Sequence, residues 1–498
     1  MMDVYRPAKK SGRFPLILIS ILVIVLVSCS TEADARFEGA ISLQVQGNHL
    51  QAVDEFTKVI GEDAEYAPAY LERGRSYIQL AQYGLAIADF TEYLDRSHDD
   101  SRGYIGRGEA SLLVGNLVDA LSDADKAVEV DAGASRAFGL RGRVFEEQGD
   151  LKRAVGDFTE SVRLAPDVAE TYLYRGETLM LLDDYQAALD DFDRALELEP
   201  ENVSAMVSRS GSLLAQKDYL EASKVLEAAV EVDVSRPDAW RILGIAYLRM
   251  GQPTRAIDAL SRAIERSPTD VDQYVQRGNA FLSMGQFPNA LNDFGVVIAL
   301  DDASVQGYYG RGLVFLAMGQ FTNAIADFDS AIERAPGHAG GLSNRGVAYL
   351  RLGQRVGDLS MFEHAVSDFS TVLAADPSNA DALANRGSAS ISLGNYAAAI
   401  RDLGLAISLD PMDPVAYFNR GLAYFAQGNF DSAAVDYSQA LRFAPDLVGV
   451  YESRAKLFAE LGRDEAAQAD MEKVVELGGD GTVLQAEIDH IRQQRSDS

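Results

Sequence analysis

The chain has 498 residues, of which 47% are hydrophobic and 24% are charged, and this composition excludes wholesale disorder. Its 75 acidic and 45 basic residues give a formal net charge of −30, which argues against nucleic acid and anionic lipid as partners. The acid excess either favours a basic protein partner or simply keeps a long chain soluble. The single cysteine excludes an internal disulfide framework and a CxxC metal or redox site.

Residues 1–28 have the pattern of an export signal, with a basic start and an apolar run over Leu16–Val27. The four residues Leu26-Val27-Ser28-Cys29 resemble the lipobox of bacterial lipoproteins. The resemblance implies that Cys29 becomes the first residue of the mature chain and carries the lipid. Residues 29–34 are then the attachment cysteine and a short linker.

An uncleaved transmembrane helix is the alternative for this segment. Phe14–Val27 has 14 residues, or about 21 Å of helix, against about 30 Å of hydrocarbon in a bilayer. Both interpretations predict that the rest of the chain lies outside the cytoplasmic membrane. In lipoproteins that this chain resembles, Ser30 is no inner-membrane retention signal, so an outer membrane is expected where the organism has one.

An alanine recurs at one fixed place thirteen times, and eleven of the twelve intervals are 34 residues. The remaining interval is 41 residues. A period of this size predicts a solenoid of stacked units, each too small to bury its own apolar face. The alanines are Ala52, Ala86, Ala120, Ala154, Ala188, Ala222, Ala256, Ala290, Ala324, Ala365, Ala399, Ala433 and Ala467.

Each unit has apolar and small residues at three- and four-residue steps on two segments split by a short break. This predicts two amphipathic helices joined by a tight turn. One unit shows the columns at Tyr70, Arg73, Gly74, Tyr77, Leu80, Tyr83, Ala86 and Phe90. These columns resemble the tetratricopeptide repeat over residues 33–481. The resemblance implies an all-α, right-handed superhelical solenoid of about 13 helix-turn-helix units.

After the repeats, Thr482–Gln494 predicts one further helix with a polar outer face. Residues 482–498 are therefore expected to be a capping helix and tail, as the end of a solenoid requires.

A second recurrent feature is a pair of opposite charges. An arginine precedes the small column in eleven of thirteen units, and an aspartate precedes the second aromatic column in ten. Leu243 replaces one arginine, and Val225 replaces the acid one unit earlier. We therefore expect each acid to pair with the arginine of the next unit.

The column before the arginine holds Asn344, Asn385 and Asn419 in three successive units. The family resemblance implies that such asparagines, on a concave face, hold an extended peptide backbone. An amide supplies both a donor and an acceptor, so it can bind a peptide unit whatever the partner's side chains are. The alternative is that asparagine is merely common in this column.

The long interval contains seven additional residues, Arg355–Met361, between the two helices of one unit. They could extend both helices by about a turn each. The extension is either harmless or a protrusion for a partner.

No catalytic motif, metal-ligand cluster or phosphate loop occurs, so no catalytic residue, metal or cofactor is expected. The repeats, the signal and the end helix leave no segment for a separate catalytic domain. The sequence predicts a membrane-anchored, extracytoplasmic scaffold for protein or peptide partners. The alternatives are an adaptor or sensor held by an uncleaved helix, and an enzyme subunit with a site between units.

Overall fold

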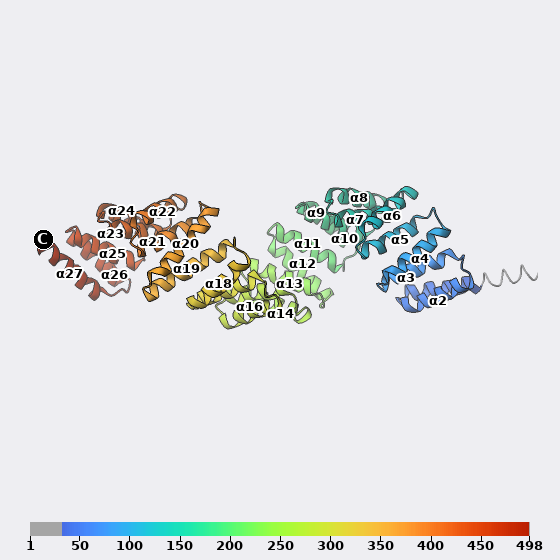
Figure 1. The fold of residues 1–498 in the computed structure, drawn as a ribbon, viewed down its shortest axis with the longest axis horizontal. Helices are drawn as coiled ribbons and strands as arrows, with labels where there is room; N and C mark the ends of the chain where they lie inside the picture. The colour runs from blue at the N-terminus through green and yellow to red at the C-terminus, as the bar shows by residue number, and fades with distance from the viewer. Residues whose placement is uncertain (1–31, 498) are drawn as a thin grey trace, which may run out of the picture. The chain divides into compact units, whose positions relative to one another are not determined.

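The computed structural model describes residues 32–497, and all regular elements in this range are helices (Figure 1). The predicted signal peptide and Cys29 lie outside the described residues. The chain forms two compact units, Met1–Ala246 and Tyr247–Ser498, and the boundary between them falls within α13 (Pro237–Arg249).

In the first unit a helical stretch over residues 32–45 precedes the numbered helices. The complete helices of this unit are α2 (His49–Glu62), α3 (Ala67–Gln79), α4 (Tyr83–Arg96), α5 (Ser101–Leu113), α6 (Leu117–Val130), α7 (Ser135–Glu147), α8 (Leu151–Leu164), α9 (Ala169–Leu181), α10 (Tyr185–Leu198), α11 (Val203–Ala215) and α12 (Tyr219–Val232).

The second unit continues the same alternation and ends in a helix that has no hairpin partner. Its complete helices are α14 (Pro253–Arg266), α15 (Val271–Ser283), α16 (Phe287–Leu300), α17 (Val305–Ala317), α18 (Phe321–Arg334), α19 (Ala339–Val356), α20 (Leu359–Ala375), α21 (Ala380–Ser392), α22 (Tyr396–Leu409), α23 (Pro414–Ala426), α24 (Phe430–Phe443), α25 (Val448–Glu460), α26 (Asp464–Glu476) and α27 (Gly481–Asp497).

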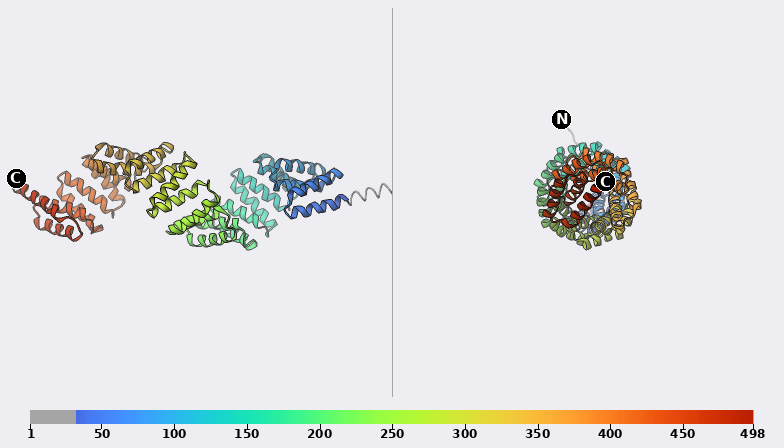
Figure 2. Two further views of the ribbon diagram at one scale, coloured as in Figure 1. Left: turned by 90° about the horizontal axis from the view of Figure 1, so that it is seen from below. Right: turned by 90° about the vertical axis from the view of Figure 1, so that its left-hand side faces the viewer.

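Each repeat is a hairpin of two helices, and Figure 2 shows these hairpins from two further directions. We call the odd-numbered helices α3 to α25 the first helices and their even-numbered partners the second helices. The prediction of an all-α stack of helix-turn-helix units is therefore confirmed. The last helix, α27, packs against α25 and α26 at the end of the second unit.

The thirteen alanines of the repeat are all fully buried. Beside them, in seven repeats, an aromatic ring of the second helix packs onto a glycine of the first helix; these two positions are called the ring column and the glycine column. A Cβ atom built on Gly176 would lie 2.6 Å from the Phe192 ring, and one on Gly312 would lie 2.7 Å from Phe328. Because no side chain fits at that distance, the ring itself requires glycine on the facing helix.

The same ring also meets the first helix of the following repeat. A Cβ atom built on Gly310 would lie 2.2 Å from Phe294, whose other neighbour is Gly278 of its own repeat. One repeat reverses this arrangement. There the ring column holds Ala124, and Leu140 of the next repeat is buried against Gly108 instead. At this junction a leucine of the following repeat therefore lies against the glycine that a ring covers elsewhere.

Ten repeats have an ion pair between their own two helices. In each, the arginine Nε and Nη2 donate to both carboxylate oxygens of one aspartate, at 2.6–2.9 Å. The pairs are Arg73–Asp89, Arg107–Asp123, Arg141–Asp157, Arg175–Asp191, Arg277–Asp293, Arg311–Asp327, Arg345–Asp368, Arg386–Asp402, Arg420–Asp436 and Arg454–Asp470.

The prediction that each acid pairs with the arginine of the next repeat is wrong. The remaining guanidinium nitrogen, Nη1, does reach the preceding repeat, but it does not bind that repeat's acid. It binds the residue two positions after the acid. Arg107 Nη1 donates to Thr91 at 3.3 Å, and Arg345 Nη1 donates to Asp329 at 2.6 Å. Eight of the ten arginines therefore join three helices. Arg311 and Arg420 join two, because Gly295 and Gly404 stand at that place in the preceding repeats.

The repeats that lack one or both members of the ion pair are consistent with pairing inside a repeat. Arg209, whose own repeat has Val225 in place of the acid, donates from Nε to Asp193 of the preceding repeat at 2.6 Å. Leu243 and Ala259 replace both members of one pair, at the spacing of 16 residues that separates Arg277 from Asp293. Arginine and acid are thus absent together within one repeat.

The seven-residue insertion extends both helices of its repeat, as predicted. Helix α19 has 18 residues and α20 has 17, against 13 in α17 and 14 in α18. Gly357 ends α19 with a φ of 74°, a left-handed conformation that glycine adopts without strain. At the tip, Val356 and Leu359 are 60% and 58% exposed.

One repeat has Tyr437 where most have phenylalanine in the ring column. Its side chain is fully buried, and its hydroxyl has no hydrogen-bond partner among residues 32–497. We expect Tyr437→Phe to raise the free energy of unfolding by about 1 kcal/mol, since it removes an unsatisfied polar group. Urea denaturation followed by circular dichroism measures the change.

The control is Tyr93→Phe, because the Tyr93 hydroxyl donates to Asp100 at 2.5 Å. That variant should lose about 1–3 kcal/mol. Burial raises the pKa of Tyr437, so the folded chain keeps this hydroxyl neutral above about pH 10, where an unfolded tyrosine ionises. The stability of the wild type should therefore fall more steeply than that of Tyr437→Phe above this pH. Equal losses in both tyrosine variants would contradict the assignment.

Candidate functional site

The first helices line the inner side of each stack. Within the first unit, α3 contacts α5, α5 contacts α7, α7 contacts α9, and α9 contacts α11. Within the second unit, each first helix from α15 to α23 likewise contacts the next first helix. No second helix of the described chain contacts the next second helix in this way. The first helices are therefore the more closely spaced row, and their exposed side chains form an inner face.

The three predicted asparagines lie on successive first helices of the second unit. Asn344 is on α19, Asn385 is on α21 and Asn419 is on α23, and each is half-buried. Helix α21 contacts both α19 and α23. The fold thus brings the three asparagines onto one row of helices, as the sequence predicts, and their role in binding stays a prediction.

The surroundings of the three asparagines differ. Asn344 Nδ2 donates to the carbonyl oxygen of Gly340 at 2.9 Å and to the hydroxyl of Tyr309 at 3.1 Å. In the part of the chain that the structure describes, the side chains of Asn385 and Asn419 make no such bonds. Their amide groups are therefore open to a ligand on both the donor and the acceptor side.

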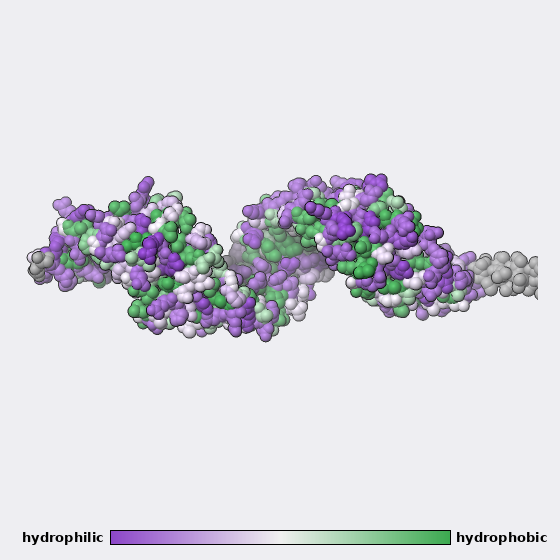
Figure 3. All heavy atoms as spheres, turned by 45° about the horizontal axis from the view of Figure 1, so that its top comes forward, coloured by the Kyte–Doolittle hydropathy of each residue, from purple (hydrophilic) through white to green (hydrophobic). Residues whose placement is uncertain are grey.

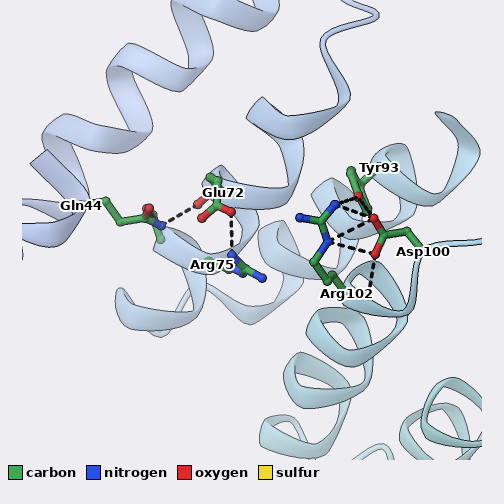
Figure 4. Close-up of polar contacts among 7 residues, drawn as sticks. Gln44, Glu72, Arg75, Tyr93, Asp100 and Arg102 are labelled. Atoms are coloured by element: carbon green, nitrogen blue, oxygen red, sulfur yellow. Dashed lines mark hydrogen bonds and ion pairs between the residues drawn. The ribbon is translucent and has the colours of Figure 1, made fainter. Parts of the chain in front are cut away.

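In the first unit the column that carries the asparagines holds Glu72, Gly106, Leu140, Tyr174 and Ser208. Figure 4 shows one example, in which Arg75 donates to Glu72 at 2.6 Å and Gln44 donates to the Glu72 carbonyl oxygen at 3.1 Å. The same view shows Tyr93 and Arg102 both bound to Asp100. These contacts satisfy the charges locally.

Two further carboxylates of the first helices have no cationic hydrogen-bond partner among residues 32–497. Glu146 on α7 accepts from the Thr178 hydroxyl at 3.2 Å, and Glu177 on α9 accepts from the Ser208 hydroxyl at 2.9 Å. Burial raises the pKa of both carboxyl groups, and the hydroxyl bonds only partly offset it. Ionised carboxylates here would be stabilised by a cation from outside the chain.

A groove of about 330 Å³ is lined mainly by α5, α7 and α9, with Ile78 of α3 and Ser161 of α8. On its wall, the Arg143 guanidinium lies 5.2 Å from the centre of the Tyr174 ring, and Arg136 pairs with Glu109 at 3.0 Å. Its apolar lining is Ile78, Leu113, Leu140 and Val168. Figure 3 shows hydrophobic residues in several places on one face of the molecule, among hydrophilic ones.

Sequence reasoning missed Tyr309, Glu146 and Glu177. They stand in inner-face columns whose residue type changes from repeat to repeat, so periodicity gives no signal for them. Position could have suggested two of them, because Tyr309 directly precedes the column that carries the asparagines and Glu177 lies one turn after it. Glu146 lies six residues after that column.

No metal-binding cluster of histidine, cysteine and acidic residues occurs within residues 32–497. None of the helices in the same range is both long enough and apolar enough to cross a bilayer. The predicted lipid-attachment residue, Cys29, lies before the first described residue.

Family models of the tetratricopeptide repeat match most of the chain. One model described as tetratricopeptide repeat matches residues 71–137, 107–169, 207–271, 275–339 and 309–359. A second matches residues 169–202 and 414–447, and a model described as TPR repeat matches residues 387–428. A comparison with curated protein sequences gave no match.

Among solved structures, the APC/C hetero-tetramer Cut9–Hcn1 is 13% identical, with a TM-score of 0.46, over 94% of this chain and 98% of the other. YrrB, described as a TPR protein with an unusual peptide-binding site, is 25% identical with a TM-score of 0.33, over 37% of this chain and 95% of its own. A tetratricopeptide repeat protein from Parabacteroides merdae is 19% identical with a TM-score of 0.41, over 51% of this chain and 98% of its own.

Proposed function

Because the chain belongs to the tetratricopeptide repeat family, we propose that it is a non-catalytic scaffold that binds proteins or extended peptides on its inner face. One observation carries the proposal. Asn344, Asn385 and Asn419 occupy the same column on three first helices that follow one another. Asn385 and Asn419 each offer a donor and an acceptor, and Asn344 offers its Oδ1 acceptor, so the row can hold a peptide backbone regardless of its sequence.

The partner is proposed to be basic. Glu146 and Glu177 are partly buried and have raised pKa values, so a lysine or arginine of a partner would stabilise their ionised forms. The formal net charge of −30 supports the same choice, since it attracts a basic chain over distance. Nucleic acid is not expected to bind.

We place the scaffold on the extracytoplasmic side of a membrane, held by lipid on Cys29. The apolar run before this cysteine and the lipobox-like Leu26-Val27-Ser28-Cys29 support it. Each buried CH₂ of an acyl chain contributes about 0.8 kcal/mol, so several chains would hold the protein stably. An uncleaved N-terminal helix is the alternative anchor.

Peptide selection tests the binding proposal. The full chain is screened against a random library of ten-residue peptides with acetylated and amidated ends, and selected peptides are measured by fluorescence anisotropy. The triple variant Asn344→Ala, Asn385→Ala and Asn419→Ala should bind at least about tenfold more weakly. Its control is Asn289→Ala with Asn323→Ala, two exposed asparagines on second helices. Selected peptides should be rich in lysine or arginine, and equal binding by both variants would refute the proposal.

Metabolic labelling with palmitate tests the anchor. The wild type should incorporate label and Cys29→Ser should not. A wild-type chain that stays on the membrane without label would instead support the uncleaved helix. Label that survives the Cys29→Ser change would remove the proposed attachment site.

A further inference from the structure

Asn344 uses both hydrogens of its amide within the chain. Its Nδ2 lies 2.9 Å from the Gly340 carbonyl oxygen, which can only accept a hydrogen bond, so the nitrogen side of the amide must face it. The second hydrogen goes to the Tyr309 hydroxyl oxygen at 3.1 Å. The Oδ1 atom of Asn344 accepts no hydrogen bond from residues 32–497, and it is therefore the free end of this side chain.

Tyr309, on α17, is left with a free donor. Its hydroxyl oxygen accepts from Asn344, and no acceptor for its own proton occurs among the described residues. Burial raises the pKa of Tyr309, so the hydroxyl keeps this proton at neutral pH. The pair thus presents one O–H donor and one carbonyl acceptor side by side.

The Tyr309 ring is held in place from two sides. The edge of the His338 ring meets it with centroids 4.8 Å apart and planes at 75°, and the Phe328 ring lies 5.9 Å away. His338 is fixed in turn, because its Nδ1 accepts the Gly341 N–H at 2.9 Å and caps α19. Donor and acceptor therefore have a defined orientation before any ligand binds.

We infer that Tyr309 is a further peptide-binding residue, and that its hydroxyl and Asn344 Oδ1 together bind the C=O and the N–H of one residue in an extended partner. In an extended strand these two groups of one residue point to the same side, and a neighbouring strand binds both at once. Tyr309 donates to the carbonyl oxygen, and Asn344 accepts the N–H. The inference rests on the proposed function, since it concerns the same inner face.

The pair occurs at only one of the three asparagines. The residue of the preceding repeat that corresponds to Tyr309 is Ser343 for Asn385 and Ala384 for Asn419. Asn344 is thus the one position of the row where donor and acceptor are both pre-oriented. It would fix which residue of a partner lies at α19, and so the register of the bound segment.

The test uses the full chain and a peptide selected from the library described above. Tyr309→Phe should weaken binding about tenfold, the loss of one hydrogen bond in a desolvated site. The matched control is Tyr308→Phe, on the same helix, whose hydroxyl accepts from Arg334 at 3.3 Å. This control should bind like the wild type.

N-methylation of the peptide, one residue at a time, separates a direct contact from misplacement of Asn344. With the wild type, one N-methyl position should cost at least about tenfold, because it removes the N–H that Asn344 accepts. The same position should stay sensitive with Tyr309→Phe and become insensitive with Asn344→Ala. Sensitivity lost in Tyr309→Phe would mean that Tyr309 only positions Asn344, and the inference would be wrong.

The remaining outcomes are also decisive. If peptides bind and depend on the asparagines but not on Tyr309, the inference fails and the proposed function stands. If Tyr308→Phe weakens binding as much as Tyr309→Phe, the inference fails as well. If no library peptide binds the wild type, both fail.

Discussion

Replacing Asp293 with alanine is expected to lower the free energy of unfolding by about 3–5 kcal/mol, because it leaves the Arg277 guanidinium without its partner in the interior. Asp293 is 1% exposed and accepts two hydrogen bonds from Arg277 at 2.8 Å. Urea denaturation of the full chain, followed by circular dichroism, measures the loss. Hydrogen exchange of α15 and α16 shows whether it is confined to this repeat.

Two controls define the mechanism. The double variant Arg277→Leu with Asp293→Ala has the residue types that the chain itself places at Leu243 and Ala259, so it should recover most of the loss. Glu160→Ala removes the partner of Arg163 in a surface ion pair and should leave stability nearly unchanged. A loss in Asp293→Ala no greater than that in Glu160→Ala would show that the interior pairs contribute little.

The second large effect is expected at the contact between Phe294 and Gly310. Phe294→Ala should cost about 3–5 kcal/mol, because the ring is fully buried and leaves a cavity. Gly310→Leu alone should also destabilise, by about 1–3 kcal/mol or more, since the ring already fills that space. The double variant should be much closer to the wild type than the sum of the two.

The chain already contains such a combination, since Ala124 stands in the ring column and Leu140 of the next repeat stands at the place that corresponds to Gly310. A double-mutant cycle measured by chemical denaturation gives the coupling. Losses that simply add would mean that the two side chains do not share one space.

The hairpins could be predicted from the sequence because their packing repeats. Ala86 and its counterparts recur at a constant spacing, and each is fully buried, so pattern and packing agree. The longer helices α19 and α20 could be predicted for the same reason, since seven added residues in a hairpin have only its two helices to extend.

The ion pairs show where a linear pattern stops being sufficient. Asp89 is 16 residues after Arg73 and 18 before Arg107, so the sequence is compatible with either partner. In the structure Asp89 pairs with Arg73, because the two helices of one hairpin pack against each other. Tyr309 was missed for a different reason: its bond to Asn344 spans 35 residues and depends on side-chain direction, which no column of the repeat encodes.

The contact between the ring column and the first helix of the following repeat, at the residue before its arginine, has a consequence for how such a chain can lose or exchange repeats during evolution. Removing residues 91–124, one period of 34, would bring Leu140 to the place of Gly106, where even a Cβ atom would lie 2.5 Å from the Phe90 ring. Removing residues 295–328 would bring Asn344 to the place of Gly310, 16 residues after Phe294. A phenylalanine followed by an asparagine at this spacing already occurs in the chain, at Phe328 and Asn344. Repeats of equal length are therefore not interchangeable modules, and only junctions whose two columns match can be rejoined.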